Sequence, residues 1–258
     1  MALNTINPTG TEAWNKLQKH YQEIQAASMH DMFQSDASRV EKFNLKWNDF
    51  LVDFSKNRIN QETLTLLLEL ANQVGLKSAI QEYFDGGIIN QTENRAVLHT
   101  ALRAKESSVI NVEGINVVPE IYEVKNKIKA FTNEITSGLR TGYTGKTFTD
   151  VVNIGIGGSD FGPRLAIEAL AHVPNIESRG MRMHFLANID TADLGRILQR
   201  ALPHSTRVII VSKSFTTLET TKNAKAVVRW LKDSGRTDSQ INNALFAVTA
   251  NVPAAKEF

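Results

Sequence analysis

The chain has 258 residues, with 29 Lys and Arg against 27 Asp and Glu, 42% hydrophobic residues and no cysteine. This length suits one large domain or two small ones, and the ordinary apolar and charged fractions exclude wholesale disorder. Without cysteine, disulfides, thiolate catalysis and cysteine-ligated metal sites are excluded. A net charge of +2 does not indicate a nucleic-acid or membrane surface.

The amino-terminal residues MALNTINPTG have neither a basic segment nor an apolar one, which predicts that the chain carries no secretory signal. No apolar run approaches the roughly 18 residues that a bilayer-spanning helix needs. We therefore expect a soluble, cytoplasmic protein with no membrane or nucleic-acid partner.

Residues 1–115 are predicted to form a mainly helical extension. Apolar residues between Trp14 and Ile24 recur at helical spacing, and Thr11 stands where an N-cap is expected. Two short apolar runs within residues 43–54 (FNLKWNDFLVDF) predict a small hairpin.

A longer helix is predicted after this extension. Apolar residues from Val117 to Ile135 are spaced alternately four and three apart, and glycines between 138 and 142 supply C-cap conformations for its end.

From about Asp150 the pattern alternates between strand and helix. The predicted strands are 151–156, 181–187, 206–212 and 244–249, with helices near 161–171, 190–201 and 217–233. Continuous apolar runs are typical of strands buried on both faces, and repeated right-handed βαβ units form a parallel sheet. The predicted fold class is α/β, a three-layer αβα sheet in a domain of residues 116–258.

Ligands of such sheets bind beyond the carboxyl ends of the strands. After the first strand comes GIGGSDFGP, in which Gly158 and Ser159 stand where a helix begins. Unpaired backbone N–H groups and the helix dipole favour a phosphate there. A tight turn capped by Ser159 or Asp160 explains the same residues equally well. Asp160 occupies the position of the third glycine of a dinucleotide-binding loop, which disfavours a nucleotide-dependent oxidoreductase.

A second polar loop, SKSFTTLET, follows the third predicted strand. Its hydroxyl groups can donate hydrogen bonds to a phosphate and Lys213 can add charge, although helix capping alone requires one hydroxyl. Together the two loops predict a phosphate site. The predicted site residues are Gly158, Ser159, Ser212, Lys213, Ser214, Phe215, Thr216 and Thr217.

The segments VVNIGIGGSDFGP and SKSFTTLETTKNAK resemble the paired phosphate-binding signatures of the phosphoglucose (glucose-6-phosphate) isomerase family. The resemblance continues upstream through residues 51–59 and 90–103. It implies a sugar-isomerase (SIS) fold, and it implies interconversion of glucose 6-phosphate and fructose 6-phosphate in glycolysis and gluconeogenesis, without metal or organic cofactor. It also implies that Gly158 and Ser159 contact the sugar phosphate or its neighbouring hydroxyls, and that residues 212–217 form the main phosphate cradle.

The chain departs from the family pattern in two places, with Ser214 where a threonine is expected and Phe161 in place of a leucine. Family members are also about twice as long. The glutamate, histidine, lysine and glycine–arginine motif expected later in the family lie beyond this sequence. The resemblance therefore implies an amino-terminal half, truncated at its carboxyl end and inactive alone, with no catalytic residue of its own. The full-length parent is expected to be a homodimer.

One alternative is a non-catalytic SIS-type sensor or regulator that only binds phosphosugars. A DNA-binding helix-turn-helix or a basic stripe would favour it, and neither stands out. No pair of residues at metal-ligand spacing and no Ser–His–Asp arrangement is recognisable, so we predict no metal site.

Overall fold

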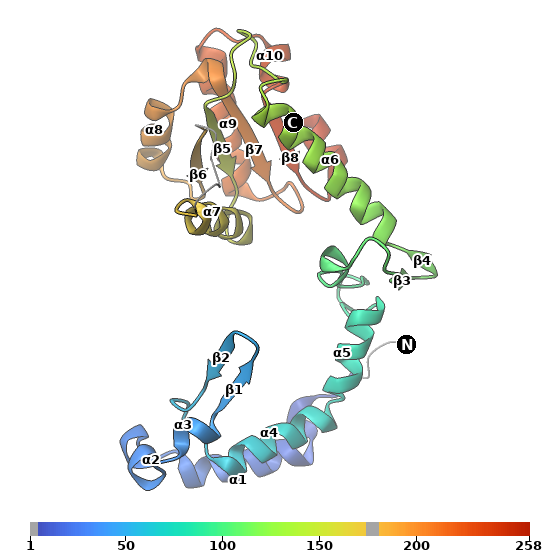
Figure 1. Cartoon of the computed structure of the whole chain (residues 1–258), viewed down its shortest axis with the longest axis vertical. Coiled ribbons are helices and arrows are strands. Elements are labelled where there is room, and N and C mark those ends of the chain that lie inside the picture. Colours follow the sequence, from blue (N-terminus) through green and yellow to red (C-terminus); the bar gives the residue numbers. More distant parts are fainter. Residues whose placement is uncertain (1–4, 174–180) are drawn as a thin grey trace. The chain divides into compact units, whose positions relative to one another are not determined.

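The computed structural model describes residues 5–173 and 181–258. The chain divides into two compact units, Met1–Lys125 and Asn126–Phe258 (Figure 1). Each unit has buried side chains of its own and is described separately below.

The first unit is mainly helical. Thr11 caps its first long helix, because its Oγ1 accepts a hydrogen bond from the backbone N–H of Trp14 at 3.2 Å. The predicted hairpin is confirmed, with two antiparallel strands in which Trp47 pairs with Phe50. The elements are η1 (Pro8–Gly10), α1 (Glu12–Ile24), α2 (Met29–Ser35), α3 (Arg39–Lys42), β1 (Asn44–Trp47), β2 (Phe50–Asp53), α4 (Gln61–Gln73), α5 (Leu76–Asp85), η2 (Ala101–Arg103), β3 (Asn111–Val112) and β4 (Ile115–Asn116).

One buried arginine fastens the loop that follows the hairpin. The Nε of Arg39 donates to the carbonyl of Ser55 at 2.7 Å, and its Nη2 donates to the carbonyls of Asn57 and Ile59 at 2.7 and 2.9 Å. Its guanidinium also lies 4.6 Å from the centroid of the Phe43 ring. A loop that would otherwise bury unpaired carbonyls is thus satisfied by a single side chain.

The predicted long helix is confirmed as α6, Val118–Thr136. It ends two residues before Gly138, whose φ of +77° is readily adopted only by glycine. The boundary between the two units falls inside this helix.

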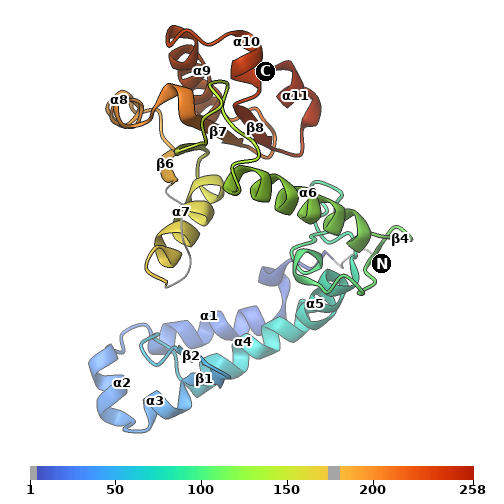
Figure 2. The same ribbon diagram turned by 45° about the horizontal axis from the view of Figure 1, so that its top comes forward.

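The second unit is built on a four-stranded sheet in the order β6-β5-β7-β8, with every pair parallel, which confirms the predicted sheet (Figures 1 and 2). Its strands are β5 (Asp150–Ile154), β6 (Arg182–Leu186), β7 (Thr206–Val211) and β8 (Leu245–Val248). All five residues of β5 are buried, whereas the edge strands β6 and β8 have exposed positions. The continuous apolar runs therefore mark the central strands most clearly.

Helices cover both faces of this sheet. The core on one face joins Val152, Val208 and Leu186 to side chains of α8 (Thr191–Arg200), α9 (Leu218–Asp233) and α10 (Asp238–Asn242). On the other face, α7 (Gly158–Leu170) packs against β5 and β6, and Phe131 of α6 lies 4.3 Å from Phe246 of β8. The remaining elements are η3 (Pro203–Ser205) and α11 (Val252–Glu257).

Among residues 5–173 and 181–258, the structure has no helix that is both long and apolar enough to cross a membrane.

Candidate functional site

The strand order places two loops at a topological switch point. From β5 the chain crosses to β6, which lies on one side of β5 in the sheet, whereas β7 lies on the other side of β5. Ile154 at the end of β5 pairs with Ile210 near the end of β7, so the loops after these strands leave the same edge of the sheet as neighbours. Ligands of open α/β sheets bind at such points.

The glycine loop after β5 is shaped by close backbone approach. A Cβ added to Gly155 would lie 2.8 Å from both the carbonyl oxygen and the Cβ of Ser159. Gly157 has φ 60° and ψ −125°, a conformation that glycine alone adopts easily. Gly158 is exposed and Ser159 half-buried, and they are the first residues of α7. The N–H groups of Ser159 and Asp160 already donate to the carbonyls of Ile156 and Gly157. What this turn can offer an anion is therefore the N–H of Gly158 and the dipole of α7.

Asp160 follows in the same turn, and its negative charge is offset within α7. Its carboxylate is 2% exposed and accepts hydrogen bonds from Nε and Nη2 of Arg164 at 3.2 and 3.0 Å. This bidentate pair offsets the negative charge of Asp160 beside the predicted phosphate-binding turn.

The hydroxyl groups of the second loop divide into two roles. Ser214 and Thr216 are exposed, and their oxygens lie 2.7 Å apart. Ser212 is buried; its Oγ accepts the N–H of Phe215 at 3.1 Å and lies 3.3 Å from Oγ1 of Thr217. Ser212 therefore organises the loop, while Ser214 and Thr216 present hydroxyls to solvent.

Phe215 gives this loop its sharp turn. Its φ of +58° is in the left-handed region, which is costly for a bulky side chain. The side chain is buried and its ring lies 5.8 Å from that of Phe258. Burial holds the residue in this conformation. Thr217 is the N-cap of α9, whose N-terminal amides and dipole favour an anion. Lys213 is exposed in the same loop.

Residues that sequence reasoning missed brace the second loop. Thr249 Oγ1 and the N–H of Ala250 both donate to the carbonyl of Lys213 at 3.1 Å, and Asn251 Nδ2 donates to the carbonyl of Ser214 at 3.0 Å. The sequence feature that could have identified Thr249, Ala250 and Asn251 is their position at the end of the fourth predicted strand. A separate contact joins α9 to the loop after β6, where Asn223 Nδ2 donates to the carbonyl of Asn188 at 3.0 Å.

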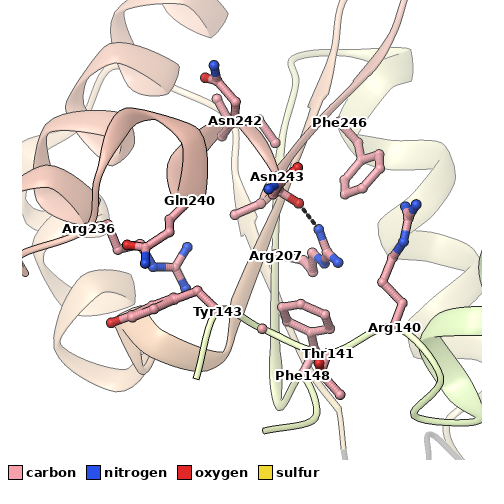
Figure 3. A pocket seen from close by; sticks show the side chains of 13 residues that line it. Arg140, Thr141, Tyr143, Phe148, Arg207, Arg236, Gln240, Asn242, Asn243 and Phe246 are labelled. Carbon is pink, nitrogen blue, oxygen red and sulfur yellow. Dashed lines mark hydrogen bonds between the residues drawn. The ribbon is translucent and has the colours of Figure 1, made fainter. Parts of the chain in front are cut away.

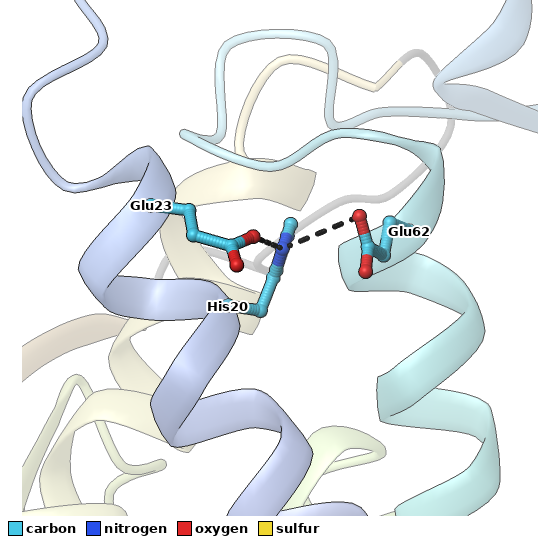
Figure 4. A group of neighbouring side chains, drawn as sticks. All are labelled: His20, Glu23 and Glu62. Carbon is cyan, nitrogen blue, oxygen red and sulfur yellow. Dashed lines mark ion pairs between the residues drawn. The ribbon is translucent and has the colours of Figure 1, made fainter.

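A separate cluster in the first unit brings a histidine and two carboxylates together (Figure 4). Nδ1 of the buried His20 lies 3.6 Å from Oε2 of Glu23 and 3.5 Å from Oε2 of Glu62, a geometry that can hold a metal ion. Nε2 lies 2.7 Å from Oγ1 of Thr63 and 3.1 Å from Oδ1 of Asn60. Both glutamates are mostly exposed, and exposed acidic groups commonly gather without an ion, so we assign no metal to this cluster.

The family model described as phosphoglucose isomerase matches residues 53–258. A curated glucose-6-phosphate isomerase of Christiangramia forsetii is 47% identical over 256 residues, which are 99% of this chain and 46% of the relative. A crystal structure of a glucose-6-phosphate isomerase from Chlamydia trachomatis matches with a TM-score of 0.76 at 24% identity, covering 96% of this chain and 46% of that one.

The structural match supports the fold, and the chain spans about half the length of the relatives that it matches. The family model covers most of the chain, including both loops of the candidate site. The chain belongs to the phosphoglucose isomerase family.

Proposed function

We propose that this chain is the phosphosugar-binding, amino-terminal part of a cytoplasmic glucose-6-phosphate isomerase, which interconverts glucose 6-phosphate and fructose 6-phosphate in glycolysis and gluconeogenesis. The observation that carries the proposal is the pairing of two anion-binding loops on the adjacent parallel strands β5 and β7. The name of the 47% identical relative supports the choice of substrate.

The phosphate group is assigned to both loops. Ser214, Thr216 and the N-terminus of α9 would donate to its oxygens, and Gly158 and Ser159 would contact it or the neighbouring sugar hydroxyls. Residues 116–258 form the phosphosugar domain in this proposal, and residues 1–115 its helical extension. Homodimeric assembly of the longer protein stays a prediction.

Isomerisation also requires a base that removes the proton alpha to the carbonyl and a group that stabilises the enediolate. We assign neither to this chain, because neither loop holds a carboxylate or imidazole in a position that the sequence or the contacts support. The chain alone is therefore expected to bind the sugar phosphate without turning it over.

Isothermal titration with glucose 6-phosphate tests the binding. Replacing the exposed hydroxyls in a Ser214→Ala, Thr216→Val double variant should weaken the affinity about tenfold or more, since each hydrogen bond to a charged group contributes about 1.5–3 kcal/mol. Thr65→Val is the matched control, because Thr65 is an exposed α4 hydroxyl that bonds only its own helix, at the carbonyl of Gln61. The absence of heat from folded protein, or equal affinities for all three proteins, would refute the assignment.

A further inference from the structure

A cavity of about 390 Å³ lies at the amino-terminal ends of β7 and β8 (Figure 3). Its volume is within the usual range of small-molecule pockets. Three arginines and three aromatic residues dominate the lining: Arg140, Arg207, Arg236, Tyr143, Phe148 and Phe246. Arg207 of β7 is five positions before Ser212, the first residue after the strand. At about 3.3 Å per residue, this places the cavity about 16 Å from the loop after β7.

Two of the arginines are buried with unused donors. Arg207 and Arg236 are each 4% exposed. Among the residues that the structure describes, Nε of Arg207 and both Nε and Nη1 of Arg236 have no hydrogen-bond partner. Nη1 of Arg207 donates to the carbonyl of Asn243. Buried guanidinium N–H groups without acceptors are costly, so the cavity is short of hydrogen-bond acceptors.

The positive charge is poorly compensated. The lining contains no aspartate or glutamate, and the nearest pairing is that of the half-exposed Arg140 with Glu134 of α6 at 3.4 Å. Burial, together with the charges of Arg140 and Arg236, lowers the pKa of Arg207 to about 10. A bound anion would reverse both effects, because it would restore acceptors and opposite charge.

Aromatic rings cover the guanidinium faces. Arg207 lies 3.8 Å from the ring centroid of Phe148 and 4.9 Å from that of Phe246, and Arg236 lies 4.8 Å from that of Tyr143. Stacking uses the faces and leaves the in-plane N–H groups for an acceptor. Arginine edges beside apolar rings suit a ligand that has an oxyanion at one end and an apolar part at the other.

We propose that this cavity is a second anion site, which binds a small organic oxyanion through Arg207, Arg236 and Arg140. The phosphate or carboxylate group of the ligand lies among the arginines, and its apolar part packs against Phe148, Phe246 and Tyr143. The site is distinct from the loops after β5 and β7 and does not depend on the function assigned to them.

The test follows the Nε–Hε signals of the arginine side chains by NMR while the chain is titrated with phenyl phosphate, benzoate or inorganic phosphate. The signals of Arg207 and Arg236, assigned by substitution, should shift saturably with phenyl phosphate or benzoate, and more weakly with inorganic phosphate. Which of the two aromatic anions binds more tightly identifies the preferred oxyanion. Arg236→Gln and the milder Arg140→Gln should each weaken binding at least tenfold. The exposed Arg229→Gln on α9 should leave it unchanged.

The Ser214→Ala, Thr216→Val variant should also keep this binding, which separates the cavity from the sugar-phosphate loops. Three results would overturn the proposal. The first is the absence of a saturable shift up to about 10 mM probe. The second is an equal shift in the Arg140 variant, the Arg236 variant and the unchanged chain. The third is a shift that follows protein concentration without any probe, which would identify a second copy of the chain as the occupant.

Discussion

At the scale of single residues, Gly155 in the turn after β5 and Gly162 in the helix that follows offer a matched comparison. Gly155→Ala adds a Cβ only 2.8 Å from backbone and side-chain atoms of Ser159, so the loop must shift. We expect the free energy of unfolding to fall by about 1–3 kcal/mol and the affinity for glucose 6-phosphate to fall with it. Urea denaturation and calorimetry measure the two effects.

Gly162→Ala in α7 is the control for that substitution. A Cβ there meets nothing within 4 Å, and alanine favours the helix by about 0.5–1 kcal/mol. This variant should be as stable as the original chain or more so, with unchanged binding. Equal effects of the two substitutions would mean that the close approach at Gly155 does not shape the loop.

At this scale, sequence reasoning could propose only site residues that lie close together in the chain. Gly158 with Ser159, and Ser214 with Thr216, belong to short runs whose composition already indicates an anion. The positive φ of Phe215 had no such signal, because it depends on burial against Phe258. Arg140, Arg207 and Arg236 are far apart in sequence, and only the sheet brings them to one cavity.

At the scale of elements, Asp150 connects the starts of β5 and β6. Its buried carboxylate accepts hydrogen bonds from Arg182 at 2.9 Å, His184 at 2.8 Å and Thr149 at 2.7 Å. Burial alone would raise the pKa of Asp150, but the bonds from Arg182, His184 and Thr149 outweigh it and hold that pKa below its ordinary value. The stabilisation is therefore fully present above the ordinary aspartate pKa and is lost as the pH falls through the lowered one.

Asp150→Asn should lower the free energy of unfolding at neutral pH by about 1–3 kcal/mol, because it leaves buried donors poorly paired. The difference in free energy of unfolding between the variant and the original chain should narrow as the pH falls below the ordinary aspartate pKa of about 3.9, because the lowered pKa of Asp150 lies below it. Urea denaturation across this range measures it. Asp233→Asn, which removes only a surface contact with Arg229 at 3.8 Å, is the control. A difference in free energy of unfolding that does not change with pH would contradict the stabilising role of the Asp150 charge.

The elements themselves were largely predictable. The four strands and α6 follow from apolar runs and periodicity, and each was found within a few residues of its predicted bounds. The order β6-β5-β7-β8 has no local signal, because it depends on which side of β5 each crossover packs. The contacts of Asn251 and Asn223 were missed for the same reason, since each joins two segments that only the strand order makes neighbours.

At the scale of the whole molecule, the two units differ in how much apolar surface they bury. The buried core of Asn126–Phe258 is one contiguous cluster across the sheet, α8, α9 and α10. Among the described residues, the first unit contributes few buried apolar side chains: Ala13, Phe43, Leu66, Ala101 and Val118. Since burial of apolar surface supplies most of the stability of a fold, we expect the first unit to unfold at a lower urea concentration than the second.

Tryptophan fluorescence separates the two transitions. Trp14 belongs to the first unit, and Trp230 packs against the core of the second. A Trp47→Phe, Trp230→Phe variant reports on Trp14 alone, and a Trp14→Phe, Trp47→Phe variant on Trp230 alone. The Trp14 curve should have the lower midpoint. Glucose 6-phosphate should raise only the Trp230 midpoint, because a ligand stabilises the unit that binds it. Coincident curves that shift together would show instead that the chain unfolds as one cooperative body.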